Sequence, residues 1–379
     1  MSLLLSDEQV QLREAAHDFL GERSPVARQR ALRDGGDALG FDPVLWRDAA
    51  DMGWTAAVFP EAVGGLDFGW QGLSAVFEEC GRTLAALPLL SNVALAGGAV
   101  LALGNAEQQQ RWLPSIIAGE PRFATAFEEG ARHAPTRVRT QARRAGAGWV
   151  LDGEKTFVID GVGADQYLVL ARSAGADDEP DGLSLFCVPA DGPGVVATGV
   201  RMVDARNTAN LALHEVHVDA DALLGTAGKA WPAFDQVLDR ARACLAAEAL
   251  GLVREVFART IDYLGQRVQF DVPIGSFQAL QHRAARLYVE IELLESAVRG
   301  AFEAIDAGSA EIGPLVSLAK ARASDLCATV PNEAVQMHGG IGVTDEFDLG
   351  LFVKRARVLR QQLGDGAFHR ERYARLRGF

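Results

Sequence analysis

The sequence predicts an α+β fold in which a small β domain lies between two helical parts. Helical periodicity runs from the start of the chain to about Gly119. Short runs of β-branched and aromatic residues, separated by Gly, Asp and Pro, then extend from Arg122 to about Leu224. Long alanine-rich helical patterns return from Trp231 onward. These changes predict three domains: helical at 1–120, β at 121–227 and helical at 228–379.

The N-terminal domain is predicted to contain several helices joined by short loops. Ser6 suits a helix N-cap, because its side chain can accept from the first turn and two acidic residues follow it. A second helix begins near Phe41-Asp-Pro and ends before Gly53, and a Gly-rich loop follows Phe59. Further helical patterns cover Gln71–Ala86, 90–104 and Ala106–Ala118.

The middle domain contains four runs typical of strands, beginning at Trp149, Gln166, Leu183 and Thr208. The loop 173–182 is rich in Asp, Gly and Pro, so we expect it to be solvated. The last domain has four long helical patterns, at 229–266, 276–307, 310–338 and 345–376. Their lengths are typical of a four-helix bundle, and we expect the last helices to bury an apolar face in a subunit interface.

Composition excludes several classes of partner. The 379-residue chain has a net charge of −13, which disfavours binding to nucleic acid or to an anionic membrane. It has no signal-peptide pattern and no apolar run of membrane-spanning length. Its four cysteines fall outside any CxxC pattern, so we expect buried thiols, a cytoplasmic protein and no metal site.

The stretch Tyr263–His282 interrupts two helical patterns and has an unusual composition. Pro273 and Gly275 break the helix, and Ser276 can cap the next one. One cation, three amides and two aromatic rings surround the break: Arg267, Gln269, Phe270, Phe277, Gln278 and Gln281. This set suits a planar cofactor with a pyrophosphate. From composition alone, however, the favoured interpretation is an ordinary bundle connection with a solvated Arg and two core Phe residues.

Two ordered motifs give the chain a family resemblance. The pattern Tyr-x3-Arg-x-Gln-Phe-x-x-Pro-Ile-x-x-Phe-Gln begins at Tyr263, and Gln-Met-His-Gly-Gly-Ile-Gly-Val-Thr begins at Gln336. Together they resemble the C-terminal signatures of the acyl-CoA dehydrogenase family, and the resemblance extends over nearly the whole chain. It implies a helical domain, a β-barrel and a four-helix bundle, with FAD as cofactor, an acyl-CoA thioester as substrate and an acceptor of the electron-transfer flavoprotein type.

The resemblance also implies how the cofactor is held. In the family, one subunit contacts the isoalloxazine ring through its β domain, and its neighbour contacts the ADP portion through the two C-terminal motifs. Carried over residue by residue, the ADP contacts are Arg267, Gln269, Phe270, Phe277, Gln278, Gln336, His338, Gly339 and Gly340. Arg267 would offer charge to phosphate, and the two glycines would allow close approach by backbone N–H groups. For His338, a surface histidine in the turn is the alternative.

The segments that resemble the isoalloxazine-binding motifs depart from the family pattern. Phe127 stands where a flavin-contacting Thr is expected, and Glu129 stands where Pro is expected. His133-Ala134 replaces the Ser-Asp pair that helps to place the thioester. Phe157 can still stack on the ring, but Ile159 replaces a hydroxyl residue and cannot donate a hydrogen bond.

The expected catalytic base is also missing. The reaction removes a proton α to the thioester while hydride leaves the β carbon, and the family uses a Glu at one of two positions. Leu363 and Ala241 occupy those positions here. Asp365 and Glu248 are the nearest carboxylates, and each has a simpler interpretation, Asp365 as a helix-end charge and Glu248 as a paired or interface carboxylate.

Three hypotheses follow. The chain is a subunit of a dimer or tetramer that lends its ADP-binding surface to an unlike catalytic chain, as in bacterial enzymes for steroid or other bulky acyl-CoA thioesters. Alternatively, it is a self-sufficient homotetrameric dehydrogenase with Asp365 or Glu248 as a relocated base. The third hypothesis is a non-enzymatic assembly protein on the same fold.

Overall fold

The computed structural model describes residues 5–379, which form two compact units, each drawn from separate stretches of the chain. One unit combines the residues up to Asp34 with Trp70–Ala85 and Arg242–Phe379. The other combines Gly35–Gly69 with Ala86–Ala241. The N-terminal helices are therefore shared between the two units, and α7 belongs to both of them.

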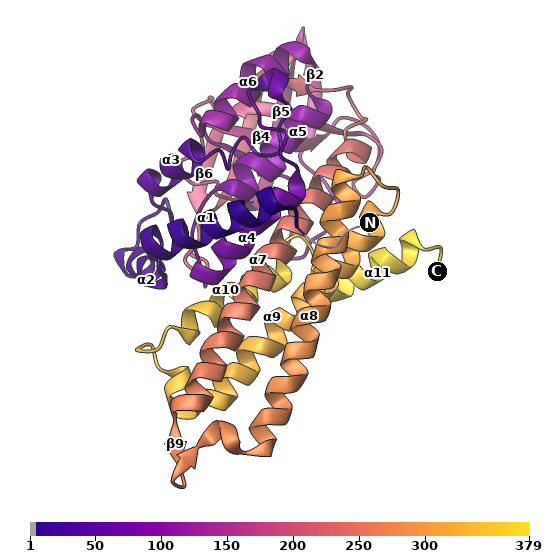
Figure 1. Ribbon diagram of the computed structural model, residues 1–379. Helices are drawn as coiled ribbons and strands as arrows, with labels where there is room; N and C mark the ends of the chain where they lie inside the picture. The colour runs from indigo at the N-terminus through magenta and orange to yellow at the C-terminus, as the bar shows by residue number, and fades with distance from the viewer. Residues whose placement is uncertain (1–4) are drawn as a thin grey trace. The chain divides into compact units, whose positions relative to one another are not determined.

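The first unit is helical apart from one short hairpin. The C-terminal helices α7, α8 and α9 lie alongside one another (Figure 1), and α9 packs on α8, α10 and α11. Ser6 caps α1 in a full capping box, which confirms its predicted role. The bounds of the helices are: α1 (Asp7–Arg23), α2 (Val26–Gly35), α4 (Trp70–Thr83), α7 (Trp231–Gln266), α8 (Gln278–Asp306), α9 (Ile312–His338), α10 (Leu349–Gln361) and α11 (Gly366–Leu376).

Two glycines allow α4 and α7 to pack backbone to backbone. A Cβ atom at Gly251 would lie 1.8 Å from the carbonyl oxygen of Glu78, and one at Gly81 would lie 1.9 Å from that of Glu248. The buried Glu78 carboxylate also forms an ion pair with Arg299 of α8 over 2.7 Å. The side chain of any other residue would force α4 and α7 apart.

The last predicted helix, 345–376, is wrong as a single element. The structure has two helices there, α10 and α11, because Leu363 has φ 56° and Gly364 has φ 105°. Such angles cannot continue a right-handed helix. The buried Lys320 ammonium stabilises the break by donating to the carbonyls of Leu359 over 3.0 Å and Gly364 over 2.9 Å.

The second unit is built on one eight-stranded sheet with the order β6-β7-β3-β2-β4-β5-β8, in which β1 also pairs with β4. The four predicted strands correspond to β3, β4, β5 and β7. The strand bounds are: β1 (Phe123–Ala126), β2 (Gln141–Ala145), β3 (Gly148–Ile159), β4 (Gln166–Arg172), β5 (Leu183–Pro189), β6 (Val195–Gly199), β7 (Thr208–Val218) and β8 (Leu223–Leu224).

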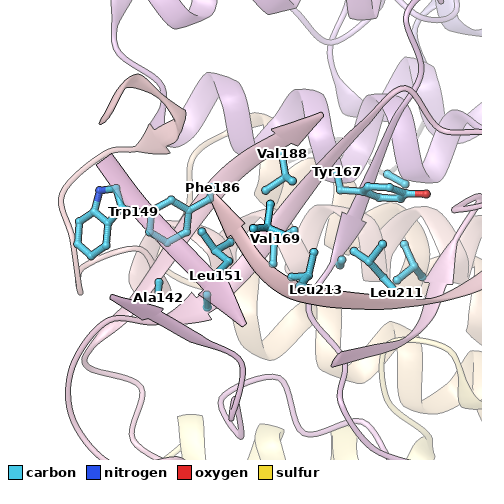
Figure 2. Close-up of a cluster of buried hydrophobic side chains, with 14 of the residues drawn as sticks. Ala142, Trp149, Leu151, Tyr167, Val169, Phe186, Val188, Leu211 and Leu213 are labelled. Carbon is cyan, nitrogen blue, oxygen red and sulfur yellow. The ribbon is translucent and has the colours of Figure 1, made fainter. Parts of the chain in front are cut away.

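One face of this sheet is closed by a cluster of apolar side chains from β3, β4, β5 and β7 (Figure 2). Trp149 of β3 meets Phe186 of β5 edge to face, with ring centroids 5.3 Å apart. The helices of this unit are α3 (Pro43–Asp51), α5 (Gly98–Leu103), α6 (Ala106–Ala118) and the π-helix η2 (Leu89–Gly97), followed by the first residues of α7.

The side chains of loop 174–181 are exposed, as predicted, but its backbone is organised around a buried cation. The guanidinium of Arg172, at the end of β4, donates to the carbonyls of Ala174, Asp177, Glu179 and Asp181. It also donates to the carbonyls of residues 136 and 138. Arg172 therefore fixes two loops that sequence patterns describe only as polar.

All four cysteines are buried thiols that form no disulfide, as predicted. Within residues 5–379, no group of His, Cys, Asp and Glu has an arrangement that could hold a metal ion. Over the same residues, we find no helix that has both the length and the apolarity needed to span a membrane.

Candidate functional site

A hairpin between α7 and α8 carries the first of the two motifs and lies at the far end of both helices (Figure 1). Strands β9 (Val268–Gln269) and β10 (Val272–Pro273) pair in antiparallel fashion. Phe270 and Asp271 connect them with φ angles of 57° and 62°, so both residues of the two-residue turn are left-handed. Such turns favour Asn and Gly, and two other residues there carry backbone strain. Strain of this kind is typical of functional turns.

The hairpin presents its aromatic side chains to the outside. Phe270 is 87% exposed and meets Phe277 edge to face, with ring centroids 6.1 Å apart. Arg267, Gln269 and Gln278 are exposed as well. The structure thus brings the cation, the amides and the two rings of this motif to one exposed segment.

The second motif forms the turn at the end of α9. Gly339 has φ 65°, which favours glycine, and the next helical turn is η5 (Gly339–Val343). A Cβ atom at Gly339 or Gly340 would meet nothing within 4 Å. Both glycines and Gln336 are exposed. The backbone of this turn can therefore be approached closely from outside the chain.

His338 differs from the exposed glycines beside it, because its side chain points inward and is only 3% exposed. Its Nδ1–H donates to the Ala334 carbonyl over 2.8 Å, and Nε2 has no hydrogen-bond partner among the described residues. The ring stacks on Tyr263, with centroids 4.4 Å apart, and burial lowers the pKa of His338. His338 is therefore a neutral buried imidazole.

Phe157 is the residue of the β domain that the sequence predicts to stack on the flavin ring. It lies in β3 beside a register shift, has φ 53° and is 44% exposed. Asn210 of β7 holds the strained residue in place, because its Oδ1 accepts from Phe157 N over 3.2 Å. Sequence reasoning missed Asn210, since only the pairing of β3 with β7 brings it to this position.

The side chains at the positions expected near the isoalloxazine ring contact other side chains of the β domain and its neighbouring helix. Phe127 is 3% exposed and packs edge to face on Phe234, 5.6 Å away. The Glu129 carboxylate accepts from Lys155 Nζ over 2.6 Å and from the backbone N–H groups of residues 139 and 140. Burial lowers the pKa of Lys155 to about 8. His133, where the thioester-placing residues are expected, contacts the Glu128 carboxylate.

The two candidate bases already have structural partners. Glu248 forms a buried two-point ion pair with Arg355, with both oxygen–nitrogen distances 2.8 Å. Asp365 is the N-cap of α11, and its Oδ1 accepts from Phe368 N over 2.9 Å. Leu363, at one of the two positions expected for a base, is 4% exposed.

The two ends of an FAD molecule fit this chain unequally. The hairpin and the glycine turn supply an exposed cation, aromatic faces and open backbone, which suit a diphosphate and an adenosine. The β domain supplies one exposed ring, Phe157, but the neighbouring positions offer an apolar ring and carboxylates already engaged in ion pairs. The residues fit the ADP end of FAD and fit the isoalloxazine end poorly.

Comparisons with known proteins agree over nearly the entire chain. Models of the N-terminal, middle and C-terminal domains of acyl-CoA dehydrogenase match residues 6–120, 124–219 and 228–376. The Acyl-CoA dehydrogenase FadE12 of Mycobacterium tuberculosis is 32% identical over 83% of each chain.

Solved structures are similar as well. A variant of the Tcur3481-Tcur3483 steroid ACAD is 31% identical, with a TM-score of 0.87 and coverage of 98% of this chain and 97% of the other. The ChsE4-ChsE5 complex from Mycobacterium tuberculosis contains a chain that is 28% identical, with a TM-score of 0.89 and coverage of 99% and 98%.

Proposed function

The chain belongs to the acyl-CoA dehydrogenase family, and we propose that it works as a subunit that lends the ADP-binding half of a flavin site to an unlike, catalytic chain. Members of this family are FAD-dependent oxidoreductases that dehydrogenate acyl-CoA thioesters. When bound, FAD accepts the hydride that leaves the β carbon of the substrate. The proposal concerns which half of the site this chain supplies.

The observation that carries the proposal is the difference between the two halves. The ADP side is open, with Arg267 and Phe270 exposed and nothing within 4 Å of the Cβ positions of Gly339 and Gly340. The residues expected near the ring and the base instead make contacts within their own units, Phe127 with Phe234, Glu129 with Lys155 and Glu248 with Arg355. If the chain had lost its flavin site altogether and had no partner, the residues of both halves should have changed, and not those of the ring half alone.

In this proposal, each group on the open side has a separate role. The Arg267 guanidinium binds the diphosphate, for which a planar, permanently charged fork is well suited. The N–H groups near Gly339 and Gly340 donate to phosphate or ribose oxygens. The aromatic faces of Phe270 and Phe277 cover the adenine and exclude water from it.

Two neighbours support an unlike partner and a bulky substrate. One similar structure is a complex of two proteins, ChsE4 and ChsE5, and another is a steroid ACAD that carries the paired name Tcur3481-Tcur3483. We extend both features to this chain as proposals, together with an electron acceptor of the electron-transferring flavoprotein type. We also propose the cytoplasm as its compartment, because four buried thiols suit a reducing environment.

Three variants test the proposal in a complex with a co-expressed acyl-CoA dehydrogenase chain from the same genome. Arg267→Ala should weaken FAD binding by the pair about tenfold or more, because a charge-assisted hydrogen bond contributes about 1.5–3 kcal/mol. Glu248→Gln and Asp365→Asn should leave the rate constant for dehydrogenation in the pair unchanged. If either carboxylate variant abolishes turnover while the chain remains folded, the self-sufficient enzyme replaces the proposal. If the pair binds no FAD, or binds it equally well with Arg267→Ala, a non-enzymatic assembly protein on this fold becomes the better account.

A further inference from the structure

The two segments assigned to the ADP end of FAD meet inside the protein through one pair of rings. Tyr263 lies one helical turn before the hairpin, and its carbonyl accepts from Arg267 N over 2.8 Å. His338 directly precedes Gly339. The Tyr263 and His338 rings stack with centroids 4.4 Å apart and an interplanar angle of 24°, and Tyr263 OH donates to the His338 carbonyl over 3.2 Å. A displacement of either ring would therefore shift both segments.

A third ring supports this pair from the loop that follows the glycine turn. The Phe347 ring lies 5.0 Å from that of His338. Its loop is fixed to α2 by ion pairs on either side, Arg33 with Asp345 over 2.6 Å and Arg30 with Asp348 over 2.8 Å. The imidazole therefore contacts two aromatic rings, one tied to the His338 carbonyl and the other on a loop held by ion pairs.

His338 is poorly placed to touch a cofactor. Its side chain is buried, and Nδ1–H is engaged by Ala334 within its own helix. A ligand outside the turn would reach the exposed backbone of Gly339 and Gly340 before it reached the imidazole. The position of His338 suits an internal connection between the motifs better than a ligand contact.

We propose that Tyr263 and His338 are positioning residues that hold the Arg267 hairpin and the Gly339–Gly340 turn at a fixed separation, and so determine the affinity for the ADP end of FAD without touching it. This inference rests on the proposed function for its consequence, FAD affinity. The coupling between the two segments is a property of the chain alone. A site held in its binding geometry loses less conformational freedom on binding and therefore binds more tightly.

The coupling is tested in the chain without cofactor by amide hydrogen exchange. Tyr263→Leu removes the ring stack and the hydroxyl, whereas Tyr263→Phe removes the hydroxyl only. Phe257→Leu is the matched control, because the Phe257 ring contacts Tyr288 across α7 and α8, 6.2 Å away, and belongs to neither motif. We expect Tyr263→Leu to speed exchange in 267–277 and in 339–343 together, Tyr263→Phe to do so weakly, and Phe257→Leu to change neither segment.

The consequence is tested in the assembled flavoprotein by FAD dissociation on dilution, followed by flavin fluorescence. We expect Tyr263→Leu to raise the Kd for FAD about tenfold and Phe257→Leu to leave it within about twofold. If Tyr263→Leu and Phe257→Leu had equal effects on exchange and on Kd, Tyr263 would contribute only to general core packing and the inference would be overturned. Faster exchange in only one segment, or in neither, would do the same. Because the exchange experiment needs no FAD, it still decides the coupling if the proposed function fails.

Discussion

At the scale of single residues, the β domain contains charged side chains that pair with each other near the position expected for the flavin ring. Glu129 and Lys155 form such a pair, with side chains 6% and 0% exposed. Burial by itself raises the pKa of Glu129, but the charge and hydrogen bond of Lys155 outweigh it and hold the pKa below its usual 4.5. The carboxylate is therefore a stabilising element of this loop and is not available as a base.

The acid stability of the protein should depend on this pair. A carboxyl group whose pKa is lower in the folded state than in the unfolded state contributes stability above the unfolded value, about 4.5, and this contribution is lost as the pH falls through the folded value. We expect Glu129→Gln to lower the free energy of unfolding at pH 7 by about 3 kcal/mol, because it leaves Lys155 buried without its partner. The difference from wild type should shrink as the pH falls below 4.5.

Urea denaturation at pH 7 and at pH 3.5 measures the loss of stability and its pH dependence, and the control is Glu154→Gln, an exposed residue next to Lys155 in β3. A Glu129→Gln protein as stable as wild type at pH 7 would contradict the assignment.

Sequence reasoning predicted the residues of the hairpin and the glycine turn as the ADP-binding residues, which stays a prediction, but missed side chains whose roles depend on distant contacts. The stretch Arg267–Gln278 is recognisable because its residues are close in sequence. Asn210 supports Phe157 from another strand, and Arg172 collects the carbonyls of two loops. A buried polar residue of this kind leaves no local pattern in the sequence.

At the scale of elements, the break between α10 and α11 depends on Lys320. Its ammonium is buried and donates to Leu359 O, Gly364 O and Ser324 Oγ. The periodicity of 345–376 did not show the break, because Leu363 favours a helix and the left-handed turn is imposed by contacts from α9 and α11. Local helix propensity thus predicts one continuous helix, but tertiary contacts at Leu363 and Gly364 break it into two.

Lys320→Met should lower the free energy of unfolding by about 2 kcal/mol, because it leaves buried carbonyl groups without a donor. Burial lowers the pKa of Lys320 to about 8, so the unfolded chain holds this proton more tightly than the folded protein. Titration of Lys320 should therefore raise the free energy of unfolding of the wild-type protein between pH 8 and about 10.5. The variant lacks this group and should show no such rise. Chemical denaturation at pH 7.5 and pH 9.5 tests this, with partly exposed Lys354→Met as the control. A larger loss of stability in wild type than in Lys320→Met on going to pH 9.5 would refute it.

The crossing of α4 and α7 gives a second test at this scale. Gly251→Ala places a methyl group 1.8 Å from the Glu78 carbonyl, so the two helices must separate, and we expect a loss of about 3 kcal/mol. Gly265→Ala in the same helix meets nothing within 4 Å and should gain up to about 1 kcal/mol from helix propensity. Thermal unfolding of the two variants should therefore shift in opposite directions. Shifts of equal sign and size would show that the close packing at Gly251 is not decisive.

At the scale of the whole molecule, the order of the three domains along the chain is visible in the sequence, but its compact units are not. The textures of residues 1–120, 121–227 and 228–379 differ clearly, and these boundaries remain our prediction. Each unit is assembled from separate stretches of the chain, and within one of them α4 from the N-terminal part packs with α7 and α8 from the C-terminal part. Such long-range pairing follows from matched surfaces, such as Gly81 against Glu248, that local periodicity does not encode.

The proposed function also belongs to the scale of the whole molecule: this chain supplies one half of a flavin site, and an unlike chain supplies the other. The most direct measurement is the visible spectrum of the purified protein, with released FAD quantified per protomer, alone and after co-expression with an unlike acyl-CoA dehydrogenase chain. The account predicts little flavin in the chain alone and about one FAD per pair of unlike chains in the complex. Full occupancy of the chain alone, with bleaching of the flavin by an acyl-CoA, would contradict it.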